Sequence, residues 1–267
     1  MSLRIQNNVE AMSAHRALSN TSDNLAKSME RLSSGYRINR AADDAAGLAI
    51  SERMRAQITG VSQAMRNAQD GISMVQTAEG SLEEVHNILQ RVRELAVQYK
   101  NGTLSTADKA AIQSEVNQLG SEIERIGGAA EFNGIRVLNT NVMITFQIGA
   151  NDGDSVSVSG ISLGAAIPAG VFQLGDTNDL QEIDDAINAV SSQRSTFGAV
   201  QNRFEHLLDG LGVYHENLVS SESRIRDVDM AEEMVSMTKY QILQQAGTSM
   251  LAQANQSSQG VLSLLRS

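Results

Sequence analysis

Apolar residues near the start of the chain recur at the spacing of paired helices. Leu18, Leu25 and Leu32 stand seven residues apart, and Met29 adds the intervening apolar position. A seven-residue repeat of this kind predicts a helix that packs along one seam against another helix. Ser33-Ser34-Gly35 is a helix-ending signal, because glycine readily adopts the left-handed conformation that closes a helix.

The longest apolar pattern runs from residue 54 to residue 75 in alternating steps of four and three. A second seam with the same alternation covers residues 82–99, shifted in phase around Glu79-Gly80-Ser81. Together they predict one helix from Asp44 to Lys100, roughly 85 Å long at 1.5 Å per residue. Asn101-Gly102 is expected to end it.

A third helix is predicted after this turn. Ser105 and Asp108 have the spacing of a capping box, in which each side chain satisfies a main-chain N–H at the start of a helix. Apolar residues then repeat in steps of four and three from Ile112 to Ile126. Gly127-Gly128 is expected to end this helix.

The period then changes to two, which is the spacing of a strand with one buried face. Apolar residues alternate over 142–148 and again at Val156 and Val158, on either side of a turn-forming stretch at 149–154. Residues 142–159 are therefore predicted to form a β-hairpin. Phe132-Asn133-Gly134-Ile135 predicts a further turn before it.

Helical spacing resumes at about Asp179 and continues to Leu211, and a last apolar segment runs from Met230 to Leu265. The flanks of the chain are thus helical and only its middle is not. We predict a mainly α fold: a long antiparallel helical bundle or coiled coil with the N- and C-terminal segments paired. A small β-hairpin region is expected at about 131–178.

The composition supports long helices and excludes several kinds of binding site and ligand. Aromatic residues make up 3% of the chain, which has one proline and no cysteine, so disulfides and thiolate metal sites are excluded. The net charge of −10 argues against a nucleic-acid ligand or an anionic membrane. No stretch approaches 18 apolar residues, so no membrane insertion is expected. No cleavable secretory signal is predicted, and the apolar register of residues 1–40 favours a helix over a transit peptide.

The candidate chemical motifs are weak. His206 and His215 are nine residues apart and do not share a helix face as zinc ligands would. Asn151-Asp152-Gly153-Asp154 is similar to a calcium loop but lacks the closing glutamate, so a plain turn is favoured. Gly210-Leu211-Gly212 lacks the third glycine of a dinucleotide motif, and the sequon at Asn101 is interpreted as a surface turn. We expect no enzyme activity, cofactor or metal.

Six segments toward the two ends of the chain match a known family: Glu30–Gly47, Ala68–Ser73, Leu89–Gln98, Phe132–Leu138, Gln241–Gln256 and Val261–Arg266. In these segments the chain resembles bacterial flagellin. The similarity covers roughly four-fifths of the chain, a span too long to be a chance motif.

This resemblance implies a structural subunit that polymerises with itself into the tubular flagellar filament. Residues 1–43 and 226–267 would form an inner coiled-coil domain, and residues 44–225 an outer helical domain with the hairpin region. Only residues 139–178 stand where many flagellins insert large outer domains, so the chain is similar to a minimal flagellin. That segment also lacks the zinc-protease motif of the few enzymatic flagellins.

The terminal seams are expected to be largely disordered in a free subunit and to be ordered by packing among subunits. The resemblance implies that the polymerisation contacts join two sets of residues. Leu18, Leu25, Met29 and Leu32 would pack against Met234, Met237, Leu251 and Leu262.

The resemblance also implies partners and a location. The chain would be exported unfolded by the flagellar type III apparatus with an export chaperone, without a cleaved signal. It would be assembled extracellularly, next to filament cap and hook-junction proteins. By the same resemblance, Arg91, Leu95 and Glu115 match residues that a host Toll-like receptor recognises, although they could equally serve contacts between subunits. The alternatives are a hook–filament junction protein, another secreted coiled-coil effector or adhesin and, more distantly, an enzyme.

Overall fold

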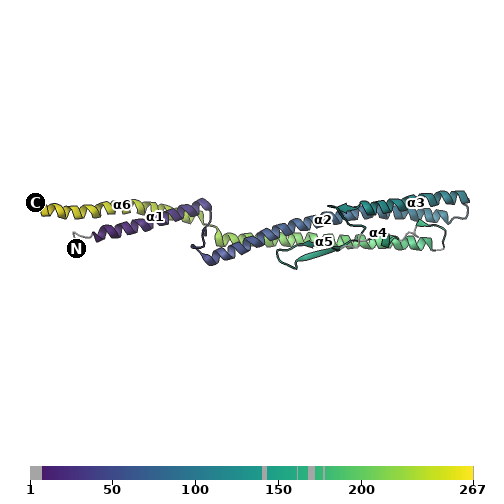
Figure 1. The fold of residues 1–267 in the computed structure, drawn as a ribbon, viewed down its shortest axis with the longest axis horizontal. Helices are drawn as coiled ribbons and strands as arrows, with labels where there is room; N and C mark the ends of the chain where they lie inside the picture. Colours follow the sequence, from purple (N-terminus) through teal and green to yellow (C-terminus); the bar gives the residue numbers. More distant parts are fainter. Residues whose placement is uncertain (1–7, 140–142, 161, 168–171, 177, 267) are drawn as a thin grey trace. The chain divides into compact units, whose positions relative to one another are not determined.

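The computed structural model describes residues 8–139, 143–160, 162–167, 172–176 and 178–266, with side chains described as far as residue 256. Two compact units divide the chain: unit 1 is Met1–Ala56 with Leu218–Ser267, and unit 2 is Gln57–Asn217. The predicted mainly α fold is confirmed (Figure 1). Its helices are α1 (Val9–Ser34), α2 (Ala45–Tyr99), α3 (Thr106–Ala129), α4 (Leu163–Ala166), α5 (Asp179–Arg226) and α6 (Met230–Arg266).

Helix α1 is capped at both ends by residues next to it in the sequence, Asn8 and Gly35. The Asn8 carboxamide accepts a hydrogen bond from the Ala11 N–H at 3.0 Å, which satisfies a free donor in the first turn. Gly35 closes the helix in the left-handed conformation, with φ of 75°. Its N–H donates to the Arg31 carbonyl at 2.9 Å, so the predicted helix end is confirmed.

Helix α2 is continuous through the predicted phase shift and ends at Tyr99, as the Asn101-Gly102 signal indicates. The capping box before α3 is also confirmed, because Ser105 and Asp108 each bind the other's main-chain N–H. Helix α3 ends at Ala129, one residue beyond the predicted stop at Gly127-Gly128. Gly127 is also closely packed: a Cβ there would lie 3.1 Å from Leu163 Cδ1.

Unit 2 holds one continuous hydrophobic core. The apolar seams of α2, α3 and α5 supply most of it, and strand and loop residues from the middle of the chain complete it. Phe204 of α5 is fully buried, with its ring directly over Gly71 of α2, where a Cβ would lie 2.9 Å from Cζ. The same ring meets Phe146 edge-on at a centroid distance of 5.6 Å. The three long helices lie side by side along this core (Figure 1).

The predicted hairpin is present as strands β3 (Met143–Gln147) and β4 (Ser155–Ser159). They pair antiparallel with Phe146 opposite Val156, and Val156 and Val158 point into the core. Val142, its predicted first residue, lies outside the described residues.

Two short strands, β1 (Glu131–Phe132) and β2 (Ile135–Arg136), form a smaller hairpin before it. Its turn residues Asn133 and Gly134 both have positive φ. The short helix α4 lies in a stretch expected to be loop, and buries Leu163.

In unit 1, α1 and α6 run antiparallel, side by side (Figure 1). At one end of the pair the Asn8 amide donates to the Ala254 carbonyl at 3.0 Å. Toward the other end Arg31 lies 3.4 Å from Glu233. The predicted pairing of the N- and C-terminal segments is therefore confirmed, although the predicted domain boundaries at 43/44 and 225/226 stay a prediction.

Two linkers join these helices to α2 and α5, and they are bonded to each other. The Arg37 N–H donates to the Arg226 carbonyl at 2.6 Å, and the Val228 N–H donates to the Gly35 carbonyl at 3.0 Å. Tyr36 and Asp227 thus face each other as in an antiparallel ladder.

Candidate functional site

The predicted contact residues of α1 lie along the seam with α6, but they are not equally covered. Leu25 is buried, with 8% of its surface exposed, while Leu18 and Leu32 are half-buried. Leu18 lies against Gly247 of α6, where a Cβ would be 3.2 Å from Leu18 Cδ1. Met29 is exposed. The α1 seam therefore has only one well-covered leucine.

The predicted contact residues of α6 show the same incomplete covering. Met237 and Leu251 are half-buried and Met234 is exposed. The antiparallel register places Met234 at the level of Arg31, because Glu233 next to it pairs with that arginine. Leu262 lies beyond the residues whose side chains are described. A polymerisation role for these eight residues stays a prediction.

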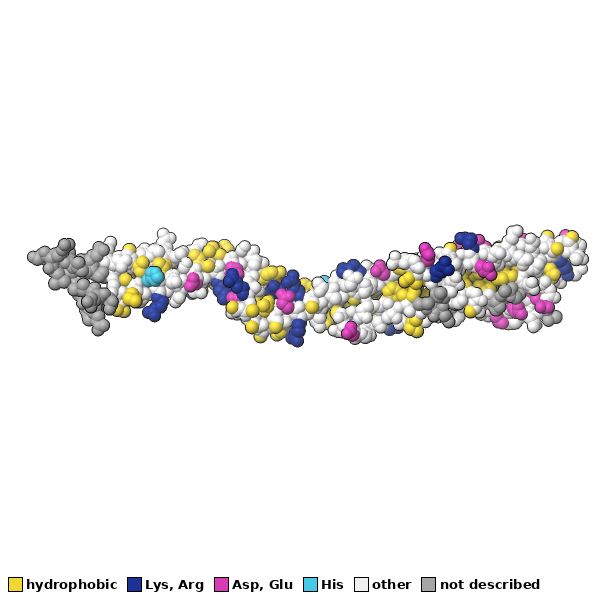
Figure 2. Space-filling view, viewed as in Figure 1, with side chains coloured by type: hydrophobic (Ala, Val, Ile, Leu, Met, Phe, Trp, Pro, Cys, Tyr) yellow, Lys and Arg dark blue, Asp and Glu magenta, His cyan; other side chains and the backbone are white. Residues whose placement is uncertain are grey.

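Many large apolar side chains of α1 and α6 are exposed on the helix pair, Met29 and Met234 among them. Among the described residues of unit 1, Leu25 and Ile38 are the only buried hydrophobic ones. Hydrophobic side chains lie at the visible surface of this helix pair in Figure 2. We call the exposed set the terminal apolar surface: Val9, Met12, Met29, Met230, Met234, Val235, Ile242, Leu243 and Met250. Large apolar side chains exposed in this number on one helix pair indicate a candidate protein–protein interface.

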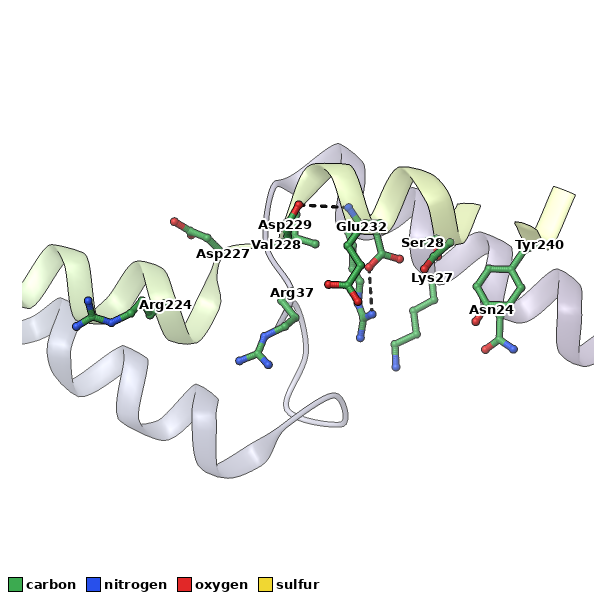
Figure 3. Close-up of a pocket in the computed structure, with 13 residues that line it drawn as sticks. Asn24, Lys27, Ser28, Arg37, Arg224, Asp227, Val228, Asp229, Glu232 and Tyr240 are labelled. Atoms are coloured by element: carbon green, nitrogen blue, oxygen red, sulfur yellow. Dashed lines mark hydrogen bonds and ion pairs between the residues drawn. The ribbon is translucent and has the colours of Figure 1, made fainter. Parts of the chain in front are cut away.

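A polar pocket of about 430 Å³ lies where α1 and α6 meet the linkers (Figure 3). Its lining carries four cations and four carboxylates. Because the charges balance, this lining selects neither an anion nor a cation, and two of its members, Arg31 and Glu233, pair with each other. The charged residues are Lys27, Arg31, Arg37, Arg224, Asp227, Asp229, Glu232 and Glu233.

Ion pairs in this region hold the first linker in place. Lys27 lies 2.7 Å from Asp43, whose carboxylate also accepts hydrogen bonds from the N–H groups of Asn39 and Arg40. The lysine and, after it, these main-chain donors lower the pKa of Asp43 to about 2. Asp43 is therefore ionised throughout the physiological range and ties the linker to α1.

Sequence reasoning missed a second cluster in unit 1. The Arg226 guanidinium lies 4.7 Å from the centre of the Tyr36 ring, and Arg226 Nη1 lies 2.7 Å from Glu52. Arg37 in turn donates to the Ile225 carbonyl at 2.6 Å. The partners in each contact are more than 170 residues apart in the chain, so no local sequence pattern predicts these contacts.

The residues predicted for receptor recognition lie in unit 2. Arg91 of α2 bridges to Glu115 of α3 at 3.0 Å and to Glu94 at 3.1 Å. The bond to Glu115, reinforced by Glu94, raises the pKa of Arg91 above its usual range. Leu95, by contrast, is only 2% exposed. The structure thus presents Arg91 and Glu115 together on the surface and places Leu95 in the core beneath them.

Other candidate chemistry is accounted for by the fold. Asn151-Asp152-Gly153-Asp154 forms the turn between β3 and β4, where the Ile148 N–H donates to the Asp154 carbonyl at 2.9 Å. Gly210 and Gly212 lie inside α5. Within the described ranges, no three His, Cys, Asp or Glu residues are grouped as metal ligands would be. Nor is any helix in those ranges apolar over enough of its length to cross a membrane.

Comparison with known proteins finds two family models along the chain. The bacterial flagellin N-terminal helical region matches residues 5–142, and the bacterial flagellin C-terminal helical region matches residues 180–265. Flagellin of Halalkalibacterium halodurans is 51% identical over 270 residues, covering 98% of this chain and 99% of the relative. The flagellar filament 33 kDa core protein of Treponema phagedenis is 49% identical over 286 residues, with the same coverage.

One solved structure is similar in fold as well as in sequence. The crystal structure of Bacillus cereus flagellin is 32% identical and covers 55% of this chain and 88% of that one, with a TM-score of 0.51.

Proposed function

The chain belongs to the bacterial flagellin family, and from this premise we propose how it assembles. It is a structural subunit of the flagellar filament. We propose that subunits join through the terminal apolar surface of α1 and α6, each copy covering the faces that its neighbour leaves exposed.

The observation that carries this proposal is the exposure of nine large apolar side chains on the α1–α6 pair. Covering one such side chain contributes roughly 1.5–3 kcal/mol. Association costs an estimated 4–15 kcal/mol in lost motional freedom. Covering about half of these residues at each contact is therefore of the magnitude that stable addition of a subunit requires.

Assembly in this form couples folding to polymerisation. An isolated two-helix pair with one well-covered leucine has little to hold it together, so α1 and α6 gain most of their stability from neighbouring copies. A chain without cysteine and with a single proline avoids the slow folding steps that disulfides and prolyl bonds introduce. These properties suit export unfolded through the flagellar type III apparatus, with a chaperone, and folding outside the cell beneath the filament cap.

The other expectations from the sequence belong to this proposal. The subunit needs no cofactor and catalyses no reaction, since its part is to pack against copies of itself and, at the base, against hook-junction proteins. Its net charge of −10 favours neither nucleic acid nor an anionic membrane. Its place is the extracellular filament.

Seeded polymerisation tests the assembly proposal. Purified subunits are added to short filament fragments and followed by electron microscopy and by sedimentation of the polymer. Continuous elongation of the seeds is expected. Subunits that stay monomeric at high concentration would refute it, and short caps that do not elongate would favour the junction-protein alternative.

We also propose that the free subunit is recognised by a host Toll-like receptor through the surface at Arg91 and Glu115. Their ion pair joins α2 to α3 and presents both charges to solvent, while Leu95 of α2 is buried in the core. Replacing Arg91 by Ala or Glu115 by Ala should abolish receptor signalling in reporter cells. A matched change at the exposed pair Arg125 and Glu122 of α3 should leave the signal unchanged. Full signalling by both Arg91→Ala and Glu115→Ala would overturn the assignment.

A further inference from the structure

Exposed methionines gather on one part of this molecule. The chain has eleven methionines, and six of them are exposed in the described structure. Five of those six lie on α1 or α6, in the terminal apolar surface: Met12, Met29, Met230, Met234 and Met250. The sixth, Met143, lies on β3 in unit 2.

An exposed methionine is chemically vulnerable in a way that the neighbouring valine and leucine residues are not. Hydrogen peroxide transfers one oxygen atom to the thioether sulfur, which is oxidised by two electrons to a sulfoxide, and the peroxide is reduced to water. The product is a polar, strongly hydrogen-bonding group on what was an apolar side chain. In a buried contact that group would have to lose its bound water without gaining a partner.

We propose that the terminal apolar surface is a redox-sensitive modification site, where peroxide oxidation of its methionines stops a free subunit from joining the polymer. The inference rests on the proposed assembly through α1 and α6. Once a subunit is assembled, neighbouring copies cover these sulfur atoms and protect them. The same residues are therefore open to oxidation before assembly and closed to it afterwards.

Three methionines of nearly equal exposure make it possible to distinguish oxidation of the terminal apolar surface from oxidation elsewhere in the chain. Met12 and Met250 of the terminal apolar surface are 68% and 65% exposed, and Met143 of unit 2 is 64% exposed. All three should react with peroxide at similar rates in the free subunit. Only oxidation at the first two should affect assembly, because only they lie on the surface that neighbouring copies cover.

The test compares three proteins, each with and without peroxide treatment: the unaltered chain, a Met143→Leu variant, and a variant with all five surface methionines changed to Leu. Sulfoxides are located by peptide mass spectrometry, and the critical monomer concentration for seeded elongation is measured. Each protein is compared with its own untreated sample, so that any change in baseline assembly cancels.

Treatment should raise the critical concentration of the unaltered chain and of Met143→Leu by about tenfold or more, equivalent to about 1.4 kcal/mol per subunit. The five-leucine variant should show little change, even though its Met143 is oxidised. Treatment of finished filaments should oxidise the five methionines far more slowly than treatment of free subunits. Methionine sulfoxide reductase should restore assembly of the treated chain.

The experiment distinguishes failure of the proposed assembly from failure of the redox inference. If the untreated chain does not elongate seeds, the proposed assembly is wrong. If the untreated chain elongates and the oxidised chain elongates equally well, assembly stands and the redox inference falls. If the five-leucine variant is as sensitive as the unaltered chain, the effect lies elsewhere and the inference falls. Should that variant not assemble at all, recovery of the oxidised chain by the reductase decides the matter, and no recovery would overturn it.

Discussion

Units 1 and 2 are both built from long helices, but they place their apolar side chains differently. In unit 2 the seams of α2, α3 and α5 meet a hairpin, and leucine, valine and phenylalanine side chains are fully covered. In unit 1 only Leu25 and Ile38 are buried among the described hydrophobic residues, and eleven large ones remain exposed, nine of them on α1 and α6. The first arrangement closes its own core, whereas the second leaves apolar side chains exposed, which neighbouring copies would cover in the proposed assembly. The same helical periodicity can therefore specify either a domain or half of an interface.

Removing most of α6 should have the largest effect and should affect the two units differently. Deleting residues 234–267 takes away most of the terminal apolar surface, and we expect seeded elongation to be lost entirely. The helical circular-dichroism signal and the thermal transition of unit 2 should remain, because its core contains no residue of the deleted segment. A truncated chain that still elongates seeds would show that α6 is not the assembly element.

One substitution made in each unit provides a matched comparison. Leu89 of α2 is fully buried in the core of unit 2, and Leu25 is the buried leucine of α1. Leu89→Ala should lower the free energy of unfolding of the monomer by about 3 kcal/mol, measured by urea denaturation. Leu25→Ala should leave that transition nearly unchanged and instead raise the critical concentration for polymerisation. Equal destabilisation of the monomer by both changes would mean that unit 1 is as self-sufficient as unit 2.

Two glycines of α2 should respond in opposite directions to the same change. Gly47 is buried beneath Ile38, where a Cβ would lie 2.8 Å from Ile38 Cδ1 and would also meet the Asp44 carboxylate. Gly47→Ala should therefore destabilise the first linker by about 1–3 kcal/mol, seen as faster amide exchange over residues 36–52. Gly80 has open space at the Cβ position, so Gly80→Ala should stabilise the helix by about 0.5–1 kcal/mol. A stabilising Gly47→Ala would contradict this packing.

The smallest expected effect is a pH dependence confined to unit 1. The pKa of Asp43 is about 2 in the folded chain, against 3.8 for the free side chain. A lowered pKa adds stability that is complete above about 3.8 and is lost as the pH falls through 2. The loss should not exceed about 1 kcal/mol, because Lys27 is half exposed and the pair is screened. Amide hydrogen exchange of the first linker in the native chain should show this loss of stability between those pH values. The substitution Asp43→Asn should remove the pH dependence.

The sequence predicts those parts of the structure that depend on neighbouring residues. Gly35 ends α1 and Ser105 with Asp108 begins α3, because caps act within one turn of a helix. The β3–β4 hairpin is predictable since alternation with period two marks a strand whichever partner it meets. The unmatched apolar seams of the two ends also predict that the terminal helices pair, and Leu18 does lie against Gly247 of α6.

Contacts between distant segments could not be predicted in the same way. Gly127 lies close to the end of α3, as its local character predicts, but its packing against Leu163 of α4 could not be predicted. No periodic pattern in the sequence predicts the hydrogen bond between Arg37 and Arg226 or the stacking of Arg226 on Tyr36. Leu95 is buried beside the seam residue Ala96, while its part in receptor recognition remains a proposal.

The paired linkers of unit 1 have a mechanical consequence. The Arg37 N–H bonds to the Arg226 carbonyl and the Val228 N–H bonds to the Gly35 carbonyl, so the two linkers lie antiparallel and cross-bonded. Hydrogen bonds of an antiparallel ladder run perpendicular to the strands. Tension along one linker therefore loads both bonds in shear at the same time instead of opening them one after another. The strain that a rotating filament imposes on one connection would be shared with the other, and neither would act as a free hinge.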